Sequence, residues 1–255
     1  MYAFRKPFAT ATFADQPLWL FDLDYKTVLL IAQVLGYALS KLIGIRVIAE
    51  FGQSGRARAI LSLIGIAWVA LVLFGAVPAP WNIAFLFLNG LPLGMIWGLV
   101  FSYVEGRRAS EAMGALLCAS FILSSGVVKS VAMLVMSWGV SEYWMPAVTG
   151  ARFVPLLLLS LGLLERLPPP DAQDVAERTA RVPMLSGARM AFLRNHGMAM
   201  LFLVSGYVLL TAIRDFRDNF AAELWAAMGY GGVASVFSAS ELPVAAVALA
   251  AVGAL

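Results

Sequence analysis

The sequence contains very little cysteine, histidine or charge. Its 255 residues include one cysteine, one histidine and only 13% charged residues. The single Cys118 excludes a disulfide framework, and with His196 as the only histidine the chain cannot assemble a metal site from Cys and His ligands. We therefore expect neither a metal nor a cofactor.

Apolar residues take the place of the missing charge. Hydrophobic residues make up 61% of the chain, and its mean hydropathy is +0.84. A soluble core cannot hide that much apolar surface, so the composition predicts an integral membrane protein with the lipid bilayer as a partner. The net charge of +3 does not indicate nucleic acid binding, because the arginines are scattered between apolar runs and form no basic face.

Long apolar runs separated by short loops predict an all-α, polytopic bundle of transmembrane helices. Residues 1–13 are too short to cross a bilayer and are expected to be the outer end of a helix. The expected spans are 27–49, 60–77, 83–104, 113–138, 145–164, 197–220 and 231–255.

Arginine and lysine in the connections predict the orientation of these spans. The loops expected outside the cell, near residues 14–26, 78–81 and 138–144, contain one basic residue, Lys26. The loops expected inside the cell contain nine arginines: Arg56, Arg58, Arg107, Arg108, Arg166, Arg178, Arg181, Arg189 and Arg194. This asymmetry places the long loop 165–196 in the cytoplasm of a cell bounded by a plasma membrane or bacterial inner membrane.

The loop 165–196 divides the chain into residues 1–164, with five full spans and the front segment, and residues 197–255, with two spans. Six helices, a central cytoplasmic loop and the start of a second set resemble the plan of the major facilitator superfamily. That resemblance implies that residues 1–164 are the N-terminal half, without the start of its first helix. It also implies that further helices of the second half are missing, and that residues 1–255 cannot transport alone.

Short motifs sharpen the resemblance to organophosphate:phosphate antiporters. The segment MYAFRKPF is similar to their first-helix signature, and GYALSK at 36–41 is similar to their second-helix pattern. The glycine-rich run 86–98 and the charged stretch 107–111 resemble their fourth helix and the loop before the fifth. As a whole, the chain resembles uncharacterised facilitator-like proteins that are known only as a domain of unknown function.

The resemblance implies a secondary transporter of a small organic anion, phosphorylated or carboxylated, that works by alternating access. Arg5, with Tyr2 in the same motif, and Lys41, with Tyr37 nearby, are the implied substrate-binding residues. For the seventh helix, Arg214 has the better depth, whereas Arg217 lies in an echo of the first-helix motif. Both stay open, with Arg214 preferred.

The placement of cations within the spans points to an anion independently of the resemblance. Lys41, Lys129, Arg152 and Arg214 lie inside apolar runs, where an uncompensated charge costs about 2.5 to 3.5 kcal/mol. They are expected to line a polar cavity, where guanidinium and ammonium groups bind phosphate or carboxylate. The alternative is internal pairing: Arg214 with Asp218, Lys41 or Lys129 with Glu241, and Arg152 with Glu142.

Glu241 is expected to be the only acidic residue deep in a span, which makes it a candidate proton carrier or a salt-bridge partner. No nucleophile with a base is recognisable, so we do not expect an enzyme. The loop 50–58 keeps only the outline of the basic facilitator loop. That departure favours the alternative function, a transporter-derived membrane sensor or assembly subunit without transport activity.

Overall fold

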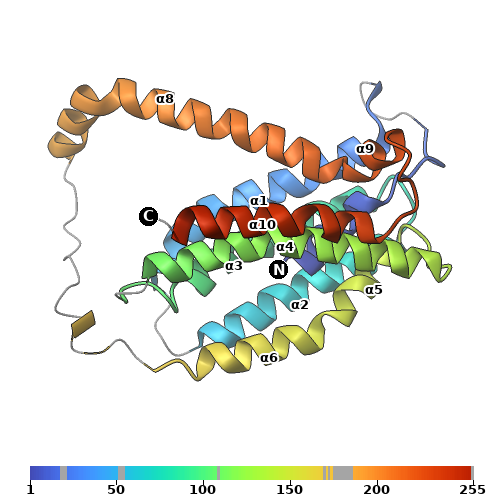
Figure 1. The fold of residues 1–255 in the computed structure, drawn as a ribbon, viewed down its shortest axis with the longest axis horizontal. Coiled ribbons are helices and arrows are strands. Elements are labelled where there is room, and N and C mark those ends of the chain that lie inside the picture. Colours follow the sequence, from blue (N-terminus) through green and yellow to red (C-terminus); the bar gives the residue numbers. More distant parts are fainter. Residues whose placement is uncertain are drawn as a thin grey trace.

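The computed structural model describes residues 1–17, 22–50, 55–107, 110–168, 171, 173–174 and 186–253, without the side chains of 45–50, 186, 188–189 and 252–253. Within these residues the chain forms helices and no strand, which confirms the predicted all-α class (Figure 1). Five of the described helices are long and apolar enough to cross a membrane. The protein is therefore a multi-pass helical membrane protein.

The helices coincide closely with the predicted apolar runs, because burial in lipid requires uninterrupted stretches of about 20 apolar residues. The prediction that residues 1–164 and 197–255 belong to two halves stays a prediction. The helices are α1 (Tyr25–Glu50), α2 (Arg56–Ala76), α3 (Ile83–Phe101), α4 (Ser110–Ser137), α5 (Met145–Arg152), α6 (Val154–Glu165), α8 (Ser186–Asn219), α9 (Ala221–Ala227) and α10 (Ser235–Gly253).

The predicted single span 145–164 is broken in the structure. Its two pieces, α5 and α6, meet at Phe153 and are bent by 42°. Pro155 explains the break, since its ring nitrogen cannot donate the helical hydrogen bond to the carbonyl of Ala151.

The front segment is also different from the expected end of an α-helix. It forms two 3-10 turns, η1 (Tyr2–Phe4) and η2 (Pro7–Thr10), because Pro7 cannot continue an α-helical ladder. Amide side chains bind the buried carbonyls of this segment. Asn89 Nδ2 donates to Phe4 O at 3.0 Å and Gln33 Nε2 donates to Arg5 O at 3.1 Å, so α3 and α1 hold the segment inside the bundle.

Small residues let the helices approach closely. A Cβ atom on Gly90 of α3 would lie 2.2 Å from Gln33 O of α1, and one on Gly126 of α4 would lie 2.4 Å from Phe237 O of α10. Figure 1 shows α10 lying along α4. These two glycines therefore lie at close helix–helix contacts, where a larger side chain would not fit.

Hydrogen bonds identify the two ends of the bundle. At one end, Arg56 donates to Ser102 O at 3.0 Å, and Tyr103 donates to Glu165. Burial and this carboxylate raise the pKa of Tyr103 to about 12. At the opposite end, the backbone N–H of Phe13 donates to Glu142 Oε2 at 2.7 Å. The helices alternate in direction between these ends, as the charge pattern predicted, although Arg108, Arg178 and Arg181 lie outside the described residues.

The long helix α8 begins at Ser186, so residues 186–196 are helical and not part of the expected loop. In Figure 1, α8 approaches the other helices at its C-terminal end and stands away from them towards its start. Near the C-terminal end of α8 lies Lys26, which was expected in a loop. It is the second residue of α1 and is buried. It pairs with Glu223 of α9 and donates to Ala9 O at 2.8 Å.

Candidate functional site

Residues from four parts of the chain line one cavity of about 290 Å³, and three of these parts contribute charged side chains. The front segment, α4, the last turns of α8 and α10 contribute its walls. The lining residues are Tyr2, Arg5, Lys6, Cys118, Phe121, Ile122, Ser125, Arg214, Asp215, Arg217, Asp218 and Glu241. Seven of these twelve residues are charged, which is unusual inside an apolar bundle.

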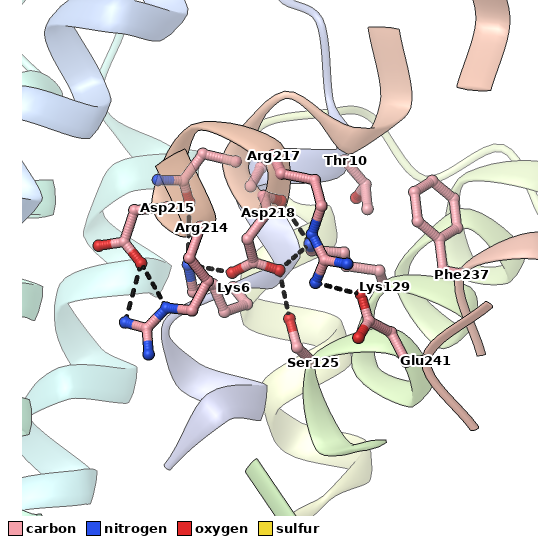
Figure 2. A network of polar contacts seen from close by, with 12 residues as sticks. Lys6, Thr10, Ser125, Lys129, Arg214, Asp215, Arg217, Asp218, Phe237 and Glu241 are labelled. Carbon is pink, nitrogen blue, oxygen red and sulfur yellow. Dashed lines mark hydrogen bonds and ion pairs between the residues drawn. The ribbon is translucent and has the colours of Figure 1, made fainter. Parts of the chain in front are cut away.

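Asp218 of α8 is the centre of this polar network (Figure 2). Its carboxylate forms ion pairs with Lys6 of the front segment and Lys129 of α4, and accepts a hydrogen bond from Ser125 Oγ at 2.6 Å. Lys6 Nζ also donates to Asn219 Oδ1 at 2.9 Å. Both lysines are buried, with 4% of Lys6 and 3% of Lys129 exposed. Asp218 therefore provides a counter-charge for both buried lysines, which would be strongly destabilising without one.

Two further ion pairs lie at the rim of the cavity. Arg217 Nη2 donates to Glu241 Oε1 at 2.9 Å, which joins α8 to α10, and Arg214 Nη2 donates to Asp215 Oδ1 at 3.1 Å. The two arginine side chains are 52% and 63% exposed, respectively. The pair of Arg214 with Asp215 is exposed on both sides and is therefore weak, whereas the Glu241 side chain is only 13% exposed.

Arg5 is different from the other cations of the cavity. Among the described residues, no carboxylate pairs with it, and its buried Nε atom has no hydrogen-bond partner. The guanidinium lies over the ring of Tyr37, 4.2 Å from its centroid. Together with Lys129, the cavity holds five cations, Arg5, Lys6, Lys129, Arg214 and Arg217, against three acids, Asp215, Asp218 and Glu241. Its net charge is positive, and Arg5 supplies the free donors.

The structure brings most of the predicted site residues together, and their role in binding stays a prediction. Lys129 is buried against the same network, and Tyr37 contacts Arg5. Lys41 is exposed and is not among the residues that line the cavity. Its Nζ atom lies 5.0 Å from the ring centroid of Tyr37. Arg152 lies away from the cavity, over Trp138. The predicted residues that line the cavity are Tyr2, Arg5, Arg214, Arg217 and Glu241.

The pairings differ from the internal pairs considered for the sequence. Arg214 pairs with its neighbour Asp215 because Asp218, one turn on, faces the two buried lysines. Glu241 pairs with Arg217 and not with a lysine. Glu142 accepts hydrogen bonds from the backbone of Thr12 and Phe13 and not from Arg152.

Glu241 is not the only acidic residue in the helical core, contrary to the sequence-based expectation. Asp218 lies in the last turn of α8, and its contacts with Lys6 and Lys129 hold it inside the bundle with its side chain only 11% exposed. The sequence predicted four cations inside the spans (Lys41, Lys129, Arg152 and Arg214) and one acid (Glu241). With Asp218 also inside the bundle, the excess of cations over acids is smaller.

Residues 7–255 match a family of unknown function. The chain belongs to DUF5690. Among curated proteins and solved structures, none shows significant similarity to it.

Sequence reasoning did not assign two central residues of this DUF5690 protein to the site: Lys6 was given no role, and Asp218 was considered only as an internal partner of Arg214. Lys6 follows Arg5 in the first motif, and Asp218 follows Arg214 by four residues, so both lay beside positions that were singled out. Gln33 and Asn89 also indicated from the sequence that polar partners lie inside the bundle, because a polar side chain inside a span requires a hydrogen-bond partner.

Proposed function

We propose that this protein is a membrane transporter of the major facilitator type that binds a small organic anion in the cavity around Arg5. The observation that carries the proposal is the state of Arg5, which lines a positively charged cavity without a carboxylate partner among the described residues. Guanidinium groups bind phosphate and carboxylate through two parallel charge-assisted hydrogen bonds. The anion would supply the partner that Arg5 lacks.

Other residues of the cavity have roles that follow from their positions. Arg214 and Arg217 line the same cavity from α8, and each holds its carboxylate through one ion pair with an exposed guanidinium, so an anion can compete for them. Lys6 and Lys129 are held by Asp218, and together they add positive charge to the cavity. Tyr2 adds a hydroxyl donor at the wall. Glu241, bound to Arg217, is the proposed proton carrier, since an anion that takes Arg217 would release its carboxylate.

Orientation is part of the same proposal. The end of the bundle with Arg56, Arg107 and Arg166 would face the cytoplasm, by the positive-inside rule. The start of α8, which stands away from the bundle, lies towards this end (Figure 1).

Thermal unfolding of the full-length protein in detergent tests the binding site. Inorganic phosphate, glycerol 3-phosphate and succinate serve as probes, and at least one is expected to raise the Tm. Arg5→Lys keeps the charge but loses the planar fork, so it should remove most of that rise. Arg58→Lys, at an exposed position outside the cavity, is the matched control and should keep it. Absence of any Tm rise in the unmutated protein would contradict the proposal.

A sensor or assembly subunit that binds the same anion without moving it is the second candidate. The buried cluster of Asp218 with Lys6 and Lys129 favours it, because a transport cycle has to break this cluster when α8 moves. Uptake of the stabilising anion into liposomes separates the two candidates. Accumulation that Arg5→Lys abolishes supports the transporter, whereas binding without uptake supports the sensor.

A further inference from the structure

Arg152 and Trp138 form a contact on the outer surface of the bundle that the proposed cavity does not use. Arg152 ends α5 and is exposed, and its guanidinium lies 4.3 Å from the ring centroid of Trp138. Trp138 follows the last residue of α4 and is 51% exposed. No carboxylate among the described residues pairs with Arg152, since Glu142 is bound to the front segment.

The contact fixes the level of the Arg152 charge in the membrane. Its Cα lies seven residues into α5, about 10 Å from the start of that helix at about 1.5 Å per residue. Side chains on a helix tilt towards its N-terminus, so the guanidinium reaches back to the level where α4 ends. The exposed Trp81 and Trp144 lie at the same end of the bundle, as the aromatic belt of a membrane interface does. The charge is therefore at the level of lipid headgroups.

We propose that Arg152 and Trp138 bind the phosphate group of an anionic phospholipid. At this level an unpaired guanidinium meets phosphate oxygens, which its fork can bind through two hydrogen bonds. The indole holds the guanidinium plane in place by a cation–π contact and leaves its edge free for the phosphate. An anionic lipid is favoured over a zwitterionic one because the described residues of the site supply one positive charge, and the carboxylate of the nearby Glu142 is bound to the front segment and so does not serve a headgroup amine.

Native mass spectrometry of the full-length protein in detergent tests this site with phosphatidylglycerol and phosphatidylcholine of matched chains. The unmutated protein should bind more phosphatidylglycerol. Arg152→Gln should weaken that binding about fivefold, the effect of one basic residue at an anionic surface. Arg58→Gln, an exposed arginine near the opposite end of the bundle, is the matched control and should change it little. Equal binding by Arg152→Gln and the unmutated protein would overturn the proposal.

Two further variants and a competition experiment complete the test. Arg152→Lys keeps the charge and is tolerated at an exposed position, and it should lose part of the lipid binding because the fork and the stacking are lost. Trp138→Leu should also lose part of it, whereas unchanged binding in both variants would overturn the site. Excess inorganic phosphate should leave the lipid adduct in place. Displacement of the lipid by free phosphate would identify a soluble anion as the ligand and overturn the lipid assignment.

Discussion

Lys129 on α4 and Asp218 on α8 form a buried ion pair between residues that are 89 positions apart in the chain. Lys6 holds the same carboxylate from the other side, so one acid connects the front segment, α4 and α8. Most of α8 lacks other partners, since none of its apolar window is buried among the described residues. The two lysine pairs of Asp218 therefore form a buried polar attachment of α8 to the bundle.

Asp218→Asn should strongly destabilise the protein. The change leaves two buried lysines uncompensated, which is expected to cost about 3 to 5 kcal/mol. Thermal unfolding in detergent should show a lower Tm. Asp215→Asn is the matched control on the same helix, and because its pair with Arg214 is exposed it should cost less than about 1 kcal/mol. Equal Tm values for the two variants would contradict the role of Asp218.

Gly126→Ala should destabilise the contact between α4 and α10. The new Cβ would lie 2.4 Å from Phe237 O, which forces the helices apart and costs about 1 to 3 kcal/mol. Gly162→Ala, in α6, meets nothing within 4 Å and should raise stability by about 0.5 to 1 kcal/mol through helix propensity. A Tm of Gly126→Ala that is equal to or higher than that of the unmutated protein would show that α10 does not pack on α4 in the membrane.

Cysteine labelling of intact cells should reveal the orientation of the bundle. In a Cys118→Ser background, an impermeant maleimide should react with Ala14→Cys and spare Gln173→Cys, because the arginine-rich end faces the cytoplasm. Both positions are exposed in the structure, so burial does not explain a difference. Labelling at residue 173 with protection at residue 14 would reverse the proposed orientation.

The positions of the helices could be predicted from the sequence because the membrane demands apolar length, and α2, α3 and α4 match the predicted runs within about four residues at each end. The break between α5 and α6 was also encoded, by Pro155, but a run of apolar residues hides a bend. The 3-10 turns of the front segment depend on Gln33 and Asn89 binding its carbonyls, which only the packed bundle reveals.

The cavity was predictable in part. Arg5 and Arg214 were expected to lie together, and both line it, because intramembrane charges require a shared polar space. Their partners were not predictable. The choice of Asp215 for Arg214 and of two lysines for Asp218 depends on how α8 is rotated against α4, and the sequence alone does not define that rotation.

Cys118 offers the most direct test of the anion site, because it is the only cysteine of the chain and it lines the same cavity as Arg5. The measurement is the rate at which N-ethylmaleimide modifies Cys118 in the full-length protein, with and without phosphate, glycerol 3-phosphate or succinate. We predict that the anion that stabilises the protein slows modification severalfold, and that Arg5→Gln removes this protection while Arg58→Gln keeps it. Equal protection in the Arg5→Gln variant, or none from any of the three anions, would contradict an anion site at Arg5.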